Sequence, residues 1–208
     1  MPQDALKLAH KYIGRKPMPA SLKKAFERNG LVQLLPGVYQ RTAQLIEEQR
    51  HEPSAKMAHL EQILPCIAFY EALLAHTGDR EKALAQFGSW CFEKIEQMAA
   101  IIPPVMKIPG LYRLIPPLMN KMLYSVFGRE AGFDYVEKEQ PNGFAVDMTR
   151  CPYVETCRQQ GCPELAQFFC KSDDICYGNM HPRLVWGRTQ TLGSGGEVCD
   201  FKMWIREK

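Results

Sequence analysis

The sequence predicts an α+β fold, with a helical N-terminal half packed against a C-terminal β-β-α-α-β-β unit that forms a four-stranded antiparallel sheet. Two observations lead to this prediction. Apolar residues recur at three- and four-residue steps up to about residue 127, and short alternating stretches separated by turn sequences follow Gly132. We therefore expect a helical region at 1–130 and an α+β region at 131–208, joined as one continuous domain.

Three segments of the N-terminal half carry the helical pattern. Residues 21–30, SLKKAFERNG, begin with a serine and end with a glycine, as a short helix does. Residues 54–78 repeat apolar side chains along one face, and Pro65 is expected to kink this helix or to start a new one. Residues 79–102 open with an acidic turn and place an apolar stripe along a third helix.

Residues 101–129 combine five prolines and four basic residues, with no acid between Glu96 and Glu130. The prolines exclude a continuous membrane-spanning helix. We expect a pair of short helices that cover a pocket or the sheet and point their basic residues to water. The alternative that this segment leaves open is peripheral contact with an anionic membrane surface.

Two hairpins enclose a pair of helices in the C-terminal part. Alternating apolar residues predict the strands, and the sequences PNG and GSGG predict the two turns. The expected order is strand 133–138, turn 141–143, strand 144–150, helix 151–161, helix 163–180, strand 183–192, turn 193–196 and strand 197–207. One sheet with helices on a single face is the economical arrangement of these elements.

The composition limits the classes of function. A net charge of +3, dispersed along the chain, argues against a nucleic-acid partner. The N-terminus lacks the apolar core of a signal peptide, and no stretch reaches the ~18 apolar residues of a membrane span. We therefore expect a cytoplasmic protein whose eight cysteines stay reduced.

Five of the cysteines fall between residues 151 and 176, separated by five, four, seven and five residues. A structural zinc site usually presents ligand pairs about two to four residues apart, and the chain contains no C-x-x-C. This spacing argues against shared metal ligation, so we predict no metal and no cofactor. Cys157 and Cys162 with His181 leave a metal site open as an alternative.

The second of the two C-terminal helices carries a stripe of reactive side chains. Cys170, Asp173 or Asp174, and Tyr177 recur at steps of three or four residues, so they share one side of the helix. A thiol, a carboxylate and a phenol on adjacent turns can line a pocket, and His181 follows just beyond the helix. The alternative is that Cys170 is a small packed residue and the aspartates are solvated.

Four stretches carry a resemblance to a known family: RCPYVETCRQQGCPEL, FFCKSDD, RTQTLGSGGEVCDF and, further upstream, ILPCIAFYEALL. Together they resemble the L-2-amino-thiazoline-4-carboxylic acid hydrolase family, in which a C-P-Y helix start, a C-x-x-D helix and a T-L-x-x-G-G-x-x-C-D-F hairpin recur in this order. The resemblance covers roughly residues 55–207 and is densest over 150–201.

The resemblance implies hydrolytic opening of a cyclic amidine that bears a carboxylate, which gives an N-carbamoyl amino acid. By position, Cys170 matches the family's helix cysteine, Asp173 its aspartate, and Thr191, Gly195, Gly196 and Cys199 its hairpin. Cys170 is then expected to act as the nucleophile, or Asp173 as the base for a water. His181 or Tyr177 is the expected proton donor.

Arg188 is our own candidate for the substrate carboxylate, because a guanidinium can bind a carboxylate in bidentate fashion. Thr191 and Asp174 are the other expected substrate-binding residues. The competing hypothesis is a non-catalytic small-molecule or lipid-binding sensor, since a helical half packed on a sheet can enclose an apolar pocket. Both hypotheses give the protein a small-molecule ligand, and a homodimer stays open in either.

Overall fold

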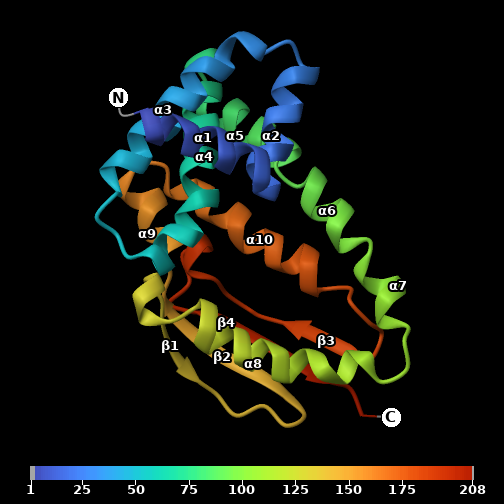
Figure 1. Cartoon of the computed structure of the whole chain (residues 1–208). Helices are drawn as coiled ribbons and strands as arrows, with labels where there is room; N and C mark the ends of the chain where they lie inside the picture. The colour runs from blue at the N-terminus through green and yellow to red at the C-terminus, as the bar shows by residue number, and fades with distance from the viewer. Residues whose placement is uncertain (1–2, 208) are drawn as a thin grey trace.

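The computed structural model describes residues 3–207, in which helices form one end of the molecule and a four-stranded antiparallel sheet forms the other (Figure 1). The helices are α1 (Gln3–Arg15), α2 (Pro17–Arg28), α3 (Leu35–Glu48), α4 (Ser54–Thr77), α5 (Arg80–Trp90), α6 (Glu93–Ala99), α7 (Ile102–Met106), α8 (Ile115–Val126), α9 (Pro152–Gln159) and α10 (Ala166–Tyr177). The strands are β1 (Asp134–Glu137), β2 (Gly143–Arg150), β3 (Leu184–Gly187) and β4 (Cys199–Ile205). The predicted α+β class is confirmed.

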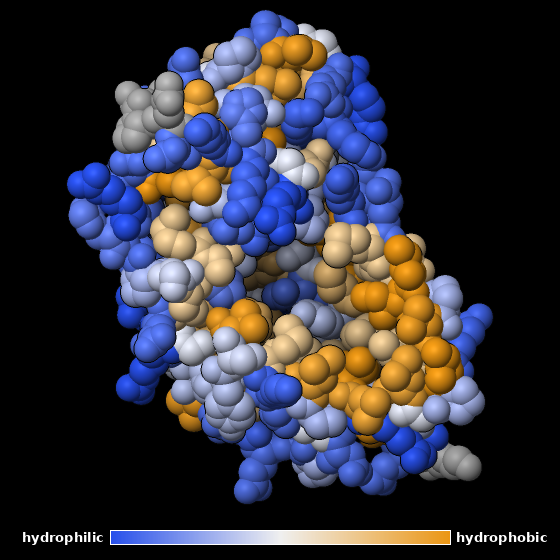
Figure 2. Space-filling model, in the orientation of Figure 1, coloured by the Kyte–Doolittle hydropathy of each residue, from blue (hydrophilic) through white to orange (hydrophobic). Residues whose placement is uncertain are grey.

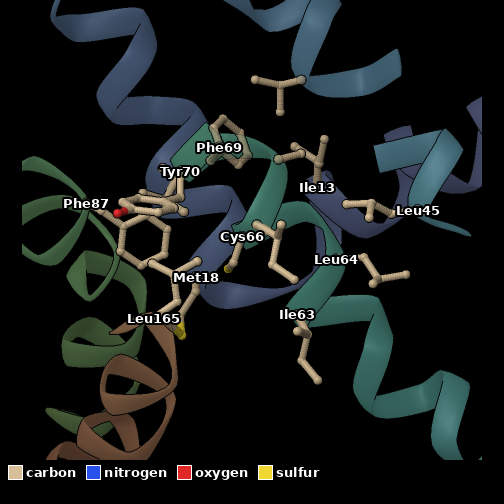
Figure 3. Packing of buried hydrophobic residues seen from close by; sticks show 14 of the residues in the cluster. Ile13, Met18, Leu45, Ile63, Leu64, Cys66, Phe69, Tyr70, Phe87 and Leu165 are labelled. Atoms are coloured by element: carbon tan, nitrogen blue, oxygen red, sulfur yellow. The ribbon is translucent and has the colours of Figure 1, made fainter. Parts of the chain in front are cut away.

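Helix α4 is the centre of the helical end, and every residue from Ile63 to Tyr70 is buried. A helix that is apolar on all sides must be surrounded, and α1, α2, α3, α5 and α9 pack around it. Figure 3 shows this core with side chains from several of these helices, among them Ile13, Met18, Leu45 and Phe87. Pro65 lies inside α4, which runs unbroken from Ser54 to Thr77, so of the two predicted alternatives the start of a new helix at Pro65 is wrong.

An ion pair joins the C-terminal helices to this core. Arg80, at the start of α5, binds Glu164 in bidentate fashion, with Nε–Oε1 and Nη2–Oε2 distances of 2.8 Å. The hydroxyl of Tyr70 on α4 donates a further hydrogen bond to Glu164. Leu165, the next residue, is fully buried in the same core. The beginning of α10 is therefore anchored to the N-terminal helices.

The sheet has the order β1-β2-β4-β3, and all neighbouring strands are antiparallel. In the β2–β4 register Val146 lies opposite Phe201 and Met148 lies opposite Cys199, so their side chains share one face. Helix α8 packs on β2 over this face, and Tyr177 of α10 packs against Trp186 of β3. The sheet thus has its helices on a single face, as predicted.

The second hairpin differs from its prediction. Strand β3 ends at Gly187 instead of continuing to residue 192, and residues 188–198 form a loop with one 3-10 turn, Leu192–Ser194. The side chain of Asp200 causes this difference, because it accepts the backbone N–H groups of Thr189 and Gln190 and so takes them out of the strand ladder. The predicted turn at GSGG is part of this larger loop.

Residues 101–129 form short helices, as expected: α7, a 3-10 turn at Leu111–Leu114, and α8. The inward side of α8 places Met119 and Leu123 against the apolar face of the sheet. Within residues 3–207 no single helix is long and apolar enough to cross a membrane, although Arg80–Met106 and Leu111–Val126, bent by 117°, meet the criterion as a pair by length and composition.

Leu165→Ala should lower the free energy of unfolding by roughly 2–5 kcal/mol, because it leaves a cavity where α10 joins the helical core. Leu118→Ala is the matched control: the same change at a side chain that is 49% exposed should cost less than about 0.5 kcal/mol. Denaturant-induced unfolding of both variants measures the difference. Equal costs for the two substitutions would contradict this packing.

Candidate active site

Helix α10 runs between the helical end and the sheet, and the loop 188–198 lies along it (Figure 1). Cys170 and Asp174 of α10 line one surface pocket with Arg188 and Thr191 of the loop. The loop approaches the thiol so closely that a Cβ atom on Gly193 would lie 2.8 Å from Cys170 Sγ. Glycine at this position therefore permits the contact between loop and thiol.

The thiol of Cys170 has donors on several sides. A hydrogen bond from the Cys199 thiol, helped by the Thr191 hydroxyl, the Arg188 charge and the Gly193 N–H, lowers the pKa of Cys170 to about 6, although burial opposes this. The pKa of Cys199 is raised, because its proton is shared with Cys170 and its thiol is buried. Cys170 is therefore the thiolate of the pair at neutral pH, which is the nucleophilic form of a cysteine.

Asp173, one turn further along α10, has the opposite shift. Burial raises the pKa of Asp173 to about 7, with Arg188 acting against the rise and the charges of Cys170 and Asp174 adding to it. Its side chain nevertheless has 38% of its surface exposed, because it borders a cavity that is partly open to solvent. Asp173 can therefore hold a proton near neutral pH beside the thiolate.

Arg188 is the cation of the site, and its side chain is only 9% exposed. Nη2 donates to the carbonyl oxygen of Cys170 at 2.6 Å and to Oδ2 of Asp174 at 2.8 Å. Trp186 Nε1 donates to the other oxygen of Asp174 at 3.1 Å, so this carboxylate holds Arg188 in place. Nη1 is buried and donates no hydrogen bond within residues 3–207, and its nearest acid, Asp173, is 3.8 Å away. An anionic ligand group can supply the acceptor that this N–H lacks once neighbouring side chains move to admit it, because the atom is closed to solvent.

Asp200 was not among the predicted site residues, although it stands in the C-D-F motif. It is buried and accepts the N–H of Thr189 and of Gln190, at 2.9 and 2.8 Å, and the Thr189 hydroxyl at 2.8 Å. Burial works against its ionisation, but these donors keep the pKa of Asp200 below its ordinary value. Asp200 thus fixes the first turn of the loop that carries Arg188 and Thr191. The alternating strand pattern hid this role, because it placed Asp200 on the outer face.

Cys170 lies between two spaces. The surface pocket, of about 400 Å³, is bordered by Cys170, Asp174, Arg188 and Thr191. On the other side, an inner cavity of about 210 Å³ is bordered by Cys170, Asp173 and mostly apolar side chains, including Phe127 and Phe201. A smaller apolar cavity of about 70 Å³ under α8 shares Asp173 with it. Figure 2 shows that this face of the molecule is hollowed between the helical end and α8.

Two predicted site residues lie apart from the thiol. The His181 ring stacks on Tyr112 at 4.2 Å between centroids, and its Nδ1 accepts the N–H of Arg183, so the structure does not bring it to Cys170. The helix ends before His181, and the following turn directs the ring away from the stripe. Tyr177 does lie beside Asp173, in the small cavity under α8, where burial raises the pKa of its phenol.

The cysteines are all free thiols. Cys157 and Cys162 lie together in the helical core, and a shared hydrogen bond with Cys162 raises the pKa of Cys157. His181 instead stacks on Tyr112, which belongs to the apolar core between the sheet and α8. The alternative metal site of Cys157, Cys162 and His181 is therefore not assembled. Within residues 3–207 no three His, Cys, Asp or Glu side chains are grouped closely enough to hold a metal ion.

The family model of L-2-amino-thiazoline-4-carboxylic acid hydrolases matches residues 56–203. The match runs from α4 to β4, so it includes Cys170, Asp173, Arg188 and Asp200. Comparison with curated proteins and with solved structures gave no match. Family membership suggests hydrolysis of 2-amino-thiazoline-4-carboxylate. Because the matched segment spans well over half of the chain, the protein belongs to the L-2-amino-thiazoline-4-carboxylic acid hydrolase family.

Proposed function

We propose that the protein is a hydrolase that opens a small cyclic amidine bearing a carboxylate, such as 2-amino-thiazoline-4-carboxylate, with Cys170 as the nucleophile. The observation that carries this proposal is the thiolate of Cys170 beside a buried cation with a free donor, Arg188, and a carboxyl that holds a proton near pH 7, Asp173. These are the three groups that the reaction requires: nucleophile, carboxylate binder and acid.

Substrate binding begins with the carboxylate. It accepts a hydrogen bond from Nη1 of Arg188, whose other nitrogen, Nη2, is already held by Asp174 and by the Cys170 carbonyl. Because these two hydrogen bonds hold the guanidinium, it sets the direction of the ring relative to the thiolate. Asp174 is therefore a positioning residue for Arg188, and the Thr191 hydroxyl helps to lower the pKa of the thiol.

In the first step the Cys170 thiolate adds to the ring carbon between sulfur and nitrogen of the protonated amidine. The bond from this carbon to the ring sulfur then breaks, and the ring sulfur leaves with the electron pair. Asp173 gives its proton to this leaving sulfur, which needs an acid because a free thiolate is a poorer leaving group in an apolar cavity. An isothiouronium linked to Cys170 is left.

In the second step a water adds to the same carbon and gives a proton to the Asp173 carboxylate. The bond between that carbon and Cys170 Sγ breaks, and the low pKa of Cys170 makes it a good leaving group. The product is an N-carbamoyl amino acid with a free thiol, and one proton passes to solvent. Direct attack of a water activated by Asp173 is the alternative that leaves no covalent intermediate.

The second candidate function is a non-catalytic sensor for a small apolar molecule or lipid. It is favoured by the inner cavities, whose walls are mainly aromatic and aliphatic side chains such as Phe127, Met148 and Phe201. Native mass spectrometry of the purified protein, together with an assay of cyclic amidine turnover, separates the two functions. A retained elongated apolar ligand favours the sensor, whereas turnover of cyclic amidines favours the hydrolase.

Cys170→Ala should lower kcat/KM for 2-amino-thiazoline-4-carboxylate by roughly a thousandfold or more, because it removes the nucleophile. Cys176→Ala is the matched control on the same helix: burial raises the pKa of Cys176, so its loss should leave turnover nearly unchanged. Steady-state assays compare the variants, and mass spectrometry of a rapidly quenched reaction looks for the adduct on Cys170. Full turnover by Cys170→Ala would remove the nucleophile assignment.

The dependence of kcat/KM on pH should be bell-shaped. The pKa of Cys170 is lowered to about 6, so the thiolate is lost as the pH falls through that value. The pKa of Asp173 is raised to about 7, so the acid is lost as the pH rises through that value. kcat/KM should therefore be greatest at about pH 6–7.

Cys199→Ala should move the acidic limb of this pH profile to higher pH, because it removes the main donor to the thiolate. An unmoved limb in this variant would argue against the thiol pair.

Arg188→Lys should raise KM for 2-amino-thiazoline-4-carboxylate roughly tenfold to a hundredfold, because lysine keeps the charge but loses the fixed fork. The variant should lose much of the preference for this substrate over 2-amino-thiazoline, which has no carboxylate. The two kcat/KM values in the wild type and the variant measure this preference. An unchanged preference would place the substrate carboxylate elsewhere.

A further inference from the structure

Large apolar side chains are exposed together along α6, α7 and α8. We call them the α6–α8 surface, which consists of Met98, Ile101, Val105, Ile108, Leu114, Leu118, Tyr124 and Val126. Their exposed fractions range from 39% to 64%. Elsewhere in residues 3–207, the exposed large apolar side chains are Val32 and Val136.

The spacing of these residues groups them along α7 and at the start of α8. Ile101, Val105 and Ile108 recur at steps of four and three around α7, and Leu114 and Leu118 are one helical turn apart at the start of α8. Figure 2 shows a hydrophobic band on the side of the molecule where Figure 1 places α7 and α8. Single exposed apolar residues are common on proteins, but a contiguous group marks an interaction site.

The fold does not require the side chains of Leu114 and Leu118 on this surface. Helix α8 is held to the sheet by its other side, where Met119 and Leu123 pack toward Phe144 and Val146. Leu114 and Leu118 point away from that contact and into solvent. Their apolar character is therefore a property of the outer surface.

Positive charge accompanies the apolar surface. Lys107, Arg113 and Lys121 are exposed within it, and the segment 97–129 contains no acidic residue. Beside it, Arg113, Arg183 and Arg206 border a groove of about 460 Å³, where the acid is Glu207. No ion pair joins these three arginines to an acid within residues 3–207. The combination matches a partner that is apolar inside and anionic at its surface.

We propose that the α6–α8 surface docks on an anionic phospholipid membrane. The apolar side chains enter the boundary between headgroups and acyl chains, and the lysines and arginines lie at the level of the phosphates. A second copy of the chain fits less well, because a two-fold pairing would place the basic residues of both copies in one interface, and segment 97–129 supplies no acid to balance them. The proposal does not depend on hydrolase activity.

Co-sedimentation with phosphatidylcholine vesicles, with and without phosphatidylserine, tests this proposal on the full chain. The wild-type protein should sediment with the phosphatidylserine vesicles and much less with phosphatidylcholine alone. The double variant Leu114→Glu/Leu118→Glu should bind at least about tenfold more weakly, because two apolar anchors are replaced by anions. Val32→Glu, a control at a side chain that is 52% exposed outside the surface, should bind like the wild type.

The charges are tested separately. Arg113→Gln and Arg183→Gln should each weaken binding to phosphatidylserine vesicles roughly fivefold, and added salt should weaken wild-type binding. Circular dichroism checks that each variant is folded. Absence of wild-type binding, or equal loss in Val32→Glu and the double variant, would overturn the proposal. So would a concentration-dependent dimer in sedimentation velocity that Leu114→Glu/Leu118→Glu dissolves, since the surface would then bind a second copy.

Discussion

The contact of the Arg188 guanidinium with α10 is the interaction on which the site depends. It joins the loop 188–198 to the helix through the Cys170 carbonyl and the Asp174 carboxylate. A buried guanidinium needs such partners, because an uncompensated charge in the interior is very costly. Asp174 neutralises the charge, while the N–H groups of Nη1 make no hydrogen bond within residues 3–207. The arrangement therefore combines structural anchoring with a site for an anion.

Hydrogen bonds and burial shift the pKa values of two neighbouring groups beside this cation in opposite directions. Arg188 favours the anionic forms of both Cys170 and Asp173, but only Cys170 also receives hydrogen bonds from Cys199, Thr191 and the loop backbone. Asp173 faces the apolar cavity and keeps its proton to higher pH. The thiol is therefore shifted toward its anion, and the carboxylic acid one helical turn away toward its neutral form. In the proposed reaction these opposite shifts supply a nucleophile and an acid under the same conditions.

Helix α8 has apolar side chains both toward the sheet and toward solvent. The inner side closes the small cavity that reaches Asp173, and the outer side belongs to the α6–α8 surface. A membrane at the outer side would lie one helix thickness, about 10 Å, from that cavity. The proposed membrane contact and the apolar cavities are thus neighbours in the structure.

The periodicity of the sequence was sufficient for the α+β class, for the strand order along the chain and for the helical stripe that holds Cys170 and Asp173. Local periodicity determines which side of a helix or strand a residue occupies, so these features needed no tertiary information. The resemblance in residues 150–201 was also enough to indicate the family that the model match shows. The same local rules failed at the second hairpin, where strand β3 is shorter than its pattern.

Tertiary structure alone decided the chemistry of the site. Asp200 binds the loop backbone outside the strand ladder, and the loop brings Arg188, Thr191 and Gly193 to the Cys170 thiol. Cys199, which is 29 residues further along the sequence, donates a hydrogen bond to the same thiol. His181 follows the stripe of Cys170 and Tyr177 closely in the sequence, but in the folded chain it packs against Tyr112 instead. Burial and long-range hydrogen bonds set a pKa, and both depend on which distant segments meet. The sequence by itself determined which side chains share an element, and the packing of those elements decided which of them share a site.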